Sequence, residues 1–161
     1  MQPAHSDALR EHLVELLEGG HAHASFEQAV RGFPAGRAGE RPKGAPHSAW
    51  ELLEHIRIAQ NDILRFSQSG EYKSPDWPEG YWPSSPAPER EEQWHASIAA
   101  FQNDLAEFLR MVNDPKADLY RPFPWGDGQT LLREALLIAD HNSYHVGQLV
   151  LVRRLLGAWQ E

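Results

Sequence analysis

The sequence predicts an all-α protein, built as a four-helix bundle with long loops rich in proline and aromatic residues. Three observations predict this fold. Four segments carry apolar residues at the three- and four-residue spacing of amphipathic helices. No segment shows the convincing alternation of apolar and polar residues that a half-buried strand needs. The length of 161 residues suits one domain with a hydrophobic core, so we expect a single bundle domain over residues 1–161.

The first helix is expected from about Ser6 to Glu18, where leucines recur at helical spacing and a pair of glycines follows. A short helical stretch is expected from about Ser25 to Arg31. The segment 32–46 is rich in glycine and proline and is expected to be a loop.

The second helix is expected to begin after Ser48 and to end near Ser69. Ser48 and Glu51 have the spacing of a capping box, in which a hydroxyl and a carboxylate each accept a backbone N–H at the helix start. His55 lies at the edge of the apolar stripe, which consists of Leu52, Ile56, Ala59, Ile63 and Phe66.

A long loop follows over residues 71–86 and combines many prolines with four aromatic residues. Long loops in compact domains are often functional, and this composition favours packing on the bundle. We expect Trp77, Tyr81 and Trp82 to wall a pocket, with a static lid on the end of the bundle as the alternative. The third helix is expected over about 88–113, and the fourth from an N-cap at Thr130 to about Leu156.

Composition excludes several classes of protein. The chain has no cysteine, which excludes disulfides, thiolate metal sites and a cysteine nucleophile, and which suits a reducing cytoplasm. No apolar run approaches the ~20 residues that span a bilayer, and no signal peptide is evident. The net charge of −8, with scattered basic residues, disfavours binding to nucleic acid. We therefore expect a cytoplasmic protein without a nucleic-acid or membrane partner.

The most informative motif is His141-Asn142-Ser143-Tyr144-His145, which places two histidines at positions i and i+4 of the fourth helix. This spacing puts both imidazoles on one helix face, where they can share a metal ion. Asn142 stands where a zinc protease has its catalytic glutamate, so the motif offers ligands without that general base.

His55 is the candidate third ligand, because bundle cores build metal sites from facing helices. His55, His141 and His145 would leave a coordination position open, as catalytic metals require. Gln148 can hydrogen-bond a ligand, whereas Asp62, about 10 Å along the helix from His55, lies too far for direct ligation. Glu51 is a candidate fourth ligand, although its capping role is favoured. We assign no metal role to His5, His12, His21, His23, His47 or His95.

Two segments carry a family resemblance. The runs 50–56 (W-E-L-L-E-H-I) and 141–149 (H-N-S-Y-H-V-G-Q-L) resemble the DinB/YfiT-like family of bacterial helical-bundle proteins, which is the damage-inducible family and not the polymerase of that name. The resemblance covers nearly the whole chain, and H-x-x-x-H-x-G-Q is its most specific element. It implies up-down-down-up connectivity and a divalent metal, most often zinc or nickel, held by His55, His141 and His145.

The resemblance also implies a function. Characterised relatives include transferases that use low-molecular-weight thiols and a mycothiol-dependent isomerase. We expect a metal-dependent enzyme that transfers such a thiol to a small electrophile, with a metal-dependent hydrolase as the close variant. The catalytic residues are unknown, and Glu51 and Glu134 are the nearest candidate bases. Two alternatives stay open: a non-catalytic, stress-linked metal-binding or interaction bundle, and a structural bundle whose histidines are core residues. A homodimer is one option for its oligomeric state.

Overall fold

The fold was analysed in a computed structural model that describes residues 3–159, with side chains from residue 7 onward. Four long helices form it: α1 (Pro3–Glu18), α3 (Ala49–Gln68), α4 (Glu91–Asn113) and α5 (Leu131–Leu155). A short helix, α2 (Phe26–Val30), and two 3-10 turns, η1 (Ala35–Arg37) and η2 (Glu79–Tyr81), lie in the connections. Within the described residues, the only strand-like feature is a single bridge between Pro122 and Thr130. The prediction of an all-α bundle is confirmed.

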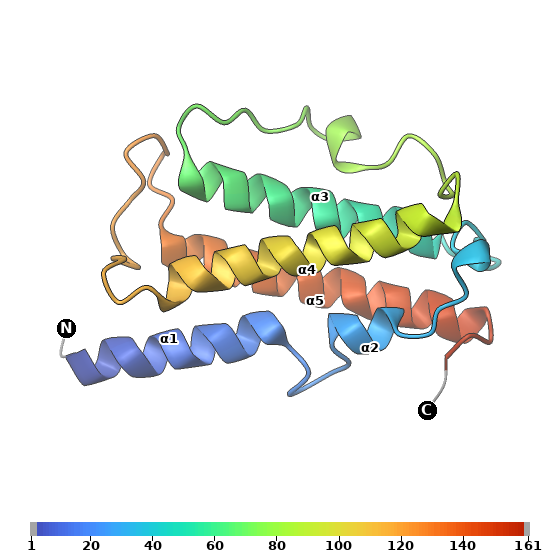
Figure 1. Ribbon diagram of the computed structural model, residues 1–161, viewed down its shortest axis with the longest axis horizontal. Helices are drawn as coiled ribbons and strands as arrows, with labels where there is room; N and C mark the ends of the chain where they lie inside the picture. Colours follow the sequence, from blue (N-terminus) through green and yellow to red (C-terminus); the bar gives the residue numbers. More distant parts are fainter. Residues whose placement is uncertain (1–2, 160–161) are drawn as a thin grey trace.

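The helix α3 lies at the centre of the packing, against both α4 and α5, while α1 packs on α4 and α5 from the other side. In Figure 1, α3 and α4 run in the same direction, and α1 and α5 run opposite to them. The chain between α3 and α4, residues 69–90, therefore has to return along the length of the bundle. We call this segment the crossing loop.

Side chains at the helix starts explain where the long helices begin. The Ser48 hydroxyl accepts the Glu51 N–H at 3.2 Å and the Glu51 carboxylate accepts the Ser48 N–H at 2.8 Å, which confirms the capping box. Thr130 accepts the Arg133 N–H at 3.1 Å, as expected of its N-cap. The third long helix begins at Glu91 rather than near residue 88. The Gln93 side chain accepts the backbone N–H of residue 89 at 2.6 Å, which keeps the preceding residues outside the helix.

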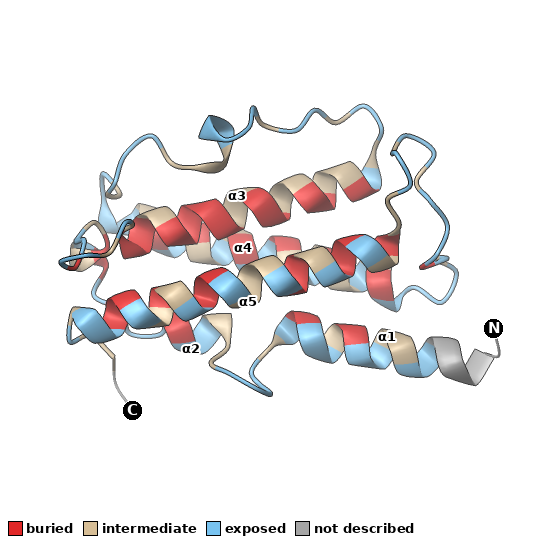
Figure 2. Ribbon diagram, turned by 180° about the vertical axis from the view of Figure 1, so that it is seen from behind, coloured by how far each residue is buried: buried red, intermediate tan, exposed pale blue. Residues whose placement is uncertain are grey.

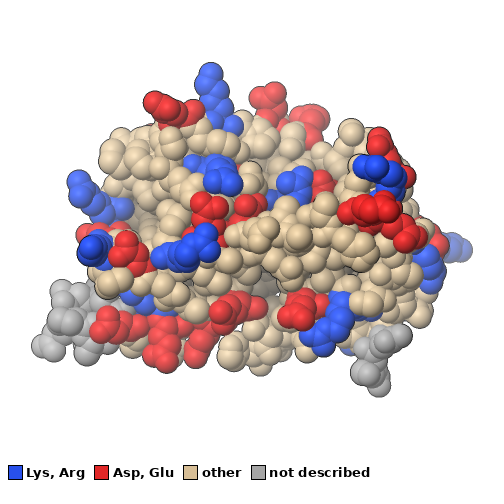
Figure 3. Space-filling model, viewed as in Figure 1, with Lys and Arg blue, Asp and Glu red and all other residues tan. Residues whose placement is uncertain are grey.

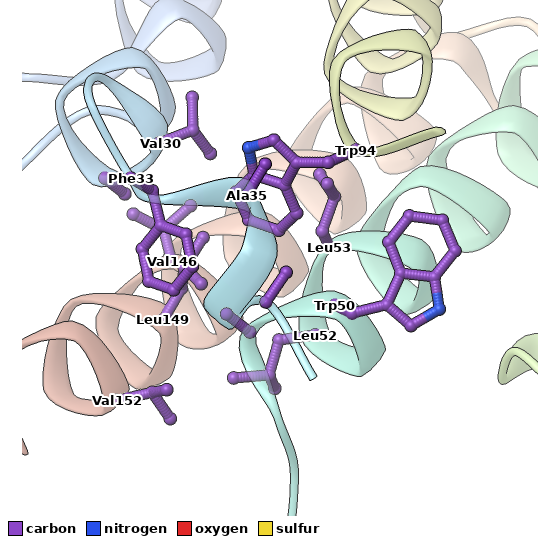
Figure 4. Close-up of a cluster of buried hydrophobic side chains, with 13 residues drawn as sticks. Val30, Phe33, Ala35, Trp50, Leu52, Leu53, Trp94, Val146, Leu149 and Val152 are labelled. Carbon is purple, nitrogen blue, oxygen red and sulfur yellow. The ribbon is translucent and has the colours of Figure 1, made fainter. Parts of the chain in front are cut away.

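Two groups of buried apolar side chains form the core. Figure 4 shows one of them, where α2, η1, α3, α4 and α5 meet around Trp94 and Leu53. The other lies between α1 and the opposite ends of α3 and α5, around Leu64 and Phe108. Along both α3 and α5, the two groups lie toward opposite ends of the helix. The three candidate ligands lie in the middle segments between them. Figure 2 shows buried residues on both helices there, whereas no residue of the crossing loop is buried.

The surface offers no obvious site for an anionic polymer on the face drawn in Figure 3. Basic and acidic side chains are interspersed there, and acidic side chains gather over α1. None of the helices in the described part of the chain is both long and apolar enough to cross a membrane.

Candidate metal centre

Two facing helices bring the three predicted ligands together. His55, from the middle of α3, meets His141 and His145, which lie one turn apart on α5, and each offers a ring nitrogen within 4.8 Å of the others. The Nε2 atoms of His55 and His141 are 3.2 Å apart. Two imidazole nitrogens on one tetrahedral zinc ion are about 3.3 Å apart, given a Zn–N bond of ~2.0 Å. The spacing of this pair therefore already suits a shared ion.

Hydrogen bonds at the far side of two rings fix which nitrogen is free. The Nδ1–H of His55 donates to the carbonyl oxygen of Tyr81 at 2.8 Å, and the Nδ1–H of His145 donates to Oε1 of Gln148 at 2.7 Å. Because a carbonyl oxygen only accepts, each proton lies on Nδ1 and each Nε2 keeps its lone pair for a ligand role. Metal-bound histidines usually have such an outer partner. The hydrogen bond expected between Gln148 and a candidate ligand is therefore present, with Gln148 as the acceptor.

The electrostatic environment keeps the three imidazoles neutral. Burial, followed by the neighbouring His145 and His55, lowers the pKa of His141 to about 4. Burial is also the main cause of the lowered pKa values of His55 and His145. Neutral imidazole is the form that binds metal, so at neutral pH the cluster is ready to act as a ligand set. The residues present thus fit a divalent transition metal.

A stack of three rings includes His55 and covers one face of its imidazole. Trp82 lies parallel to His55, with ring centroids 4.0 Å apart and planes at 4°, and His47 stacks on the other face of Trp82 at 4.2 Å. His47 has no predicted role, yet after burial it is a further cause of the lowered pKa values of His55 and His145. No periodic pattern marked His47, because it precedes a helix and meets the cluster only through a loop residue.

A pocket of about 370 Å³ opens beside the cluster. The three histidines form one wall, and the others are formed by Ala59, Asp62, Ile63, Trp77, Tyr81 and Leu137. The Tyr81 hydroxyl donates to Oδ2 of Asp62 at 2.7 Å. Of the three aromatic residues expected to wall the pocket, Trp77 and Tyr81 line it, whereas Trp82 does not and instead stacks on His55. The volume is within the range of small-molecule sites, about 300–1,000 Å³.

The two candidate bases do not line this pocket. Glu51 is held in the capping box and by an ion pair with Arg41, so it is not a fourth ligand. Glu134 is 1% exposed and pairs with Arg133 at 2.8 Å. The carboxylate that does line the pocket is that of Asp62. Its position two turns from His55 excludes it from the ligand set, as expected, but leaves it facing the same cavity.

Asn142 explains why the α5 motif lacks the chemistry of a zinc protease. Its Nδ2 donates to Oε1 of Gln60 at 2.9 Å, and Gln60 in turn donates to the carbonyl of Phe101 at 2.8 Å. The side chain therefore joins a polar network in the core and does not line the pocket. The nearby Tyr144 is 65% exposed and contacts His145 edge-on, so it lies outside the core.

The remaining histidines do not join the cluster within the described part of the structure. His12 pairs with Glu15 on the surface, the ring of His23 bonds a neighbouring carbonyl, and His95 is exposed. The side chain of His5 lies outside the described residues. No metal role was expected of His12, His23 or His95, and all three lie outside the cluster.

Comparison with known proteins adds a family. A family model described as the DinB superfamily matches residues 20–149, a range that includes all three clustered histidines and the crossing loop. Neither the curated proteins nor the solved structures give a significant match.

Proposed function

The chain belongs to the DinB superfamily, and from this membership and its three-histidine cluster we propose that it is a metal-dependent enzyme acting on a small molecule. One observation carries the proposal: three neutral imidazoles converge on one wall of an open pocket of about 370 Å³. A site with three protein ligands that faces a cavity has the arrangement of a catalytic metal, whereas structural sites are closed by four.

The cofactor that suits this donor set is a divalent transition metal, with zinc or nickel first, because imidazole is a preferred ligand of both. When bound, such an ion lowers the pKa of a thiol or a water molecule and polarises an electrophile. His55, His141 and His145 would hold it. Tyr81 and Gln148 orient two of these rings through their hydrogen bonds.

The reaction that we favour is transfer of a low-molecular-weight thiol to an electrophile. The chain has no cysteine, so the sulfur has to come from a cosubstrate. The thiol loses its proton to solvent, its sulfur forms a bond to an electrophilic carbon, and the leaving group departs with the bonding electrons. The apolar walls formed by Ala59, Ile63 and Leu137 limit the water that competes with the thiolate.

Metal-dependent hydrolysis is the second candidate, and Asp62 favours it. This carboxylate lines the same pocket as the histidines and is a candidate general base for a water molecule. A non-catalytic metal-binding bundle is less well supported. A closed site would need a fourth protein ligand, and the foremost candidate, Glu51, is engaged elsewhere.

The test uses the full chain without a histidine tag. Bound metal is measured first, and the metal-loaded protein is then assayed with a panel of small thiols and a chromogenic electrophile. The proposal predicts about one divalent ion per chain and thiol-dependent turnover that disappears in a His55→Ala, His141→Ala, His145→Ala triple variant. Metal binding without turnover of any thiol or ester substrate would contradict an enzymatic role.

A further inference from the structure

The pocket beside the histidine cluster has one fixed charge, and it is negative. Among the residues that line the pocket, Asp62 is the only acidic one, and no lysine or arginine lines it. The Oδ2 atom of Asp62 accepts the Tyr81 hydroxyl at 2.7 Å. The Oδ1 atom is shielded from solvent and has no close hydrogen-bond partner within the described residues. A second tyrosine lies beside the carboxylate, since burial, followed by Asp62, raises the pKa of Tyr72. A carboxylate accepts up to about four hydrogen bonds, so Asp62 retains unused acceptor capacity.

The arginines of α3 on either side of Asp62, and Arg133 of α5, are paired with other acids. Arg57 pairs with Glu54 at 2.7 Å. Arg65, on the same helix, pairs with Asp104 at 3.9 Å and with Glu107 at 3.7 Å. Arg133 pairs with Glu134 at 2.8 Å. Asp62 therefore has no cationic partner within the part of the chain that the structure describes. A half-buried carboxylate without a cationic partner is costly, and that cost falls when a cation binds.

The negative charge of Asp62 also acts on its surroundings. Burial is the main cause of the raised pKa values of Tyr81, Tyr72 and Glu134, and Asp62 raises all three further. Each of these three groups therefore gains its negative charge less readily beside Asp62. A ligand that enters meets the histidine cluster at one wall and this carboxylate at another.

We propose that Asp62 determines specificity in this pocket, by binding a protonated amine on the same small molecule whose thiol reaches the histidine cluster. The inference rests on the proposed function, and it names the substrate class as aminothiols. His55 and Asp62 are two turns apart on α3, about 10 Å along the helix axis. The amine and the sulfur are therefore at opposite ends of the ligand, and Trp77 and Tyr81 flank the space between them.

The test compares ligands that differ only in the amine. Zinc-loaded protein is titrated by calorimetry with linear aminothiols of two to six methylene groups, and with the mercaptoalcohols of the same lengths. We expect the best aminothiol to bind about tenfold tighter than its mercaptoalcohol, as one hydrogen bond to a charged group implies. Asp62→Asn should reduce that preference to within about twofold, while zinc content stays unchanged. Asparagine still offers an oxygen to Tyr81, so the crossing loop keeps its anchor.

The matched control is Asp140→Asn. Asp140 is exposed, directly precedes His141 and does not line the pocket, so its removal changes the charge near the cluster without changing the pocket. The aminothiol preference should survive in this variant. Differences in thiol acidity between the two ligand series are the same in every protein and cancel when the variants are compared.

The outcomes separate the inference from the proposed function. A zinc-loaded protein that binds mercaptoalcohols and aminothiols equally well would overturn the role of Asp62 and leave thiol transfer standing. A preference that persists in Asp62→Asn would overturn it as well. Failure of every thiol to bind to the zinc-loaded protein would overturn thiol transfer and the aminothiol inference together.

Discussion

His55 is oriented by Tyr81, a residue of the crossing loop: its Nδ1–H donates to the Tyr81 carbonyl at 2.8 Å. The side chain of the same Tyr81 returns to α3, where its hydroxyl donates to Asp62 at 2.7 Å. Two residues of one helix, two turns apart, thus hold one loop residue by its backbone and by its side chain. The geometry of a candidate ligand and the position of the loop are therefore coupled.

Tyr81→Phe tests this coupling. The variant keeps the ring and the carbonyl but removes the hydroxyl that Asp62 accepts. We expect the free energy of unfolding of the metal-free protein to fall by about 1.5–3 kcal/mol, the usual value of a hydrogen bond to a charged group. We also expect weaker zinc binding, because the less firmly held loop no longer fixes the His55 ring. Urea unfolding and competition with a chromophoric chelator measure the two effects.

The control for that variant is Tyr144→Phe. Tyr144 is 65% exposed, and no hydrogen bond of its hydroxyl is found in the described part of the structure. Removal of this hydroxyl should leave the free energy of unfolding and the zinc affinity near those of the wild type. Equal zinc affinity in Tyr81→Phe and the wild type would show that the loop does not position the ligand.

Single alanine variants test the ligand set. His55→Ala, His141→Ala and His145→Ala should each lose most of the bound divalent metal, because two imidazoles from this cluster hold an ion far less tightly than three. His12→Ala, His23→Ala and His95→Ala change exposed histidines outside the cluster and should retain it. Elemental analysis of untagged protein gives the metal content per chain. Full occupancy in His145→Ala would remove that residue from the assignment.

Gln148→Ala tests the outer partner of His145. The side chain of Gln148 accepts the Nδ1–H of His145 at 2.7 Å and so sets which nitrogen is free. Loss of such a partner typically weakens metal affinity by about 10- to 100-fold. Gln102→Ala, an exposed change on α4, is the control. Chelator competition at fixed pH measures both, and an unchanged affinity in Gln148→Ala would assign Gln148 a packing role only.

Much of the fold and the ligand candidates could be predicted because both depend on local patterns. The capping box at Ser48 and the spacing of His141 and His145 are properties of single helices. His55 was predicted to face the pair because it lies near the apolar stripe of its own helix. Each of these inferences needs only the helical period and the rule that apolar faces meet.

The parts that escaped prediction depend on where the crossing loop runs. A loop without periodicity gives no direction for its side chains, so neither the Tyr81 carbonyl on His55 nor the stack of His47 on Trp82 could be inferred. Asp62 was judged by its distance along the helix, which excludes direct ligation correctly. That distance does not show that the loop encloses Asp62 and the histidines in one pocket.

Trp77 at the mouth of the pocket should affect ligand binding without affecting the fold. Its side chain is 76% exposed, contacts Tyr81 edge-on at 5.4 Å and lines the pocket. Trp77→Ala should leave thermal stability and zinc content unchanged and weaken thiol binding several-fold, since a cavity wall is lost. Trp125→Ala removes a hydrogen bond to the Phe66 carbonyl, and neither residue lines the pocket. This variant should lose thermal stability and keep its thiol binding. Calorimetry and thermal melts distinguish the two.

The metal-free protein should lose stability as the pH falls below about 6.5. The unfolded chain binds protons at an ordinary histidine pKa of ~6.5, whereas burial lowers the pKa values of all three clustered histidines in the folded chain, that of His141 to about 4. Above pH 6.5 both states are neutral and these residues have no pH-dependent effect. Between about pH 6.5 and 4 the unfolded state binds more protons, so the free energy of unfolding decreases.

For His141 alone the loss is on the order of 2–3 kcal/mol across that range, since one pKa unit is worth about 1.4 kcal/mol. Urea unfolding of chelator-treated protein at several pH values measures it. His141→Leu should flatten the dependence, and His12→Ala, which changes an exposed histidine, should not.

Saturating zinc adds stability at pH 7.5 because it binds only the folded chain. The stability that zinc adds should shrink toward pH 4, because protons displace the ion from imidazoles whose pKa values lie below 6.5. Up to about three protons are taken up for each ion released. A zinc increment that is equal at pH 7.5 and pH 4.5 would exclude an all-histidine ligand set and direct the search to carboxylate ligands.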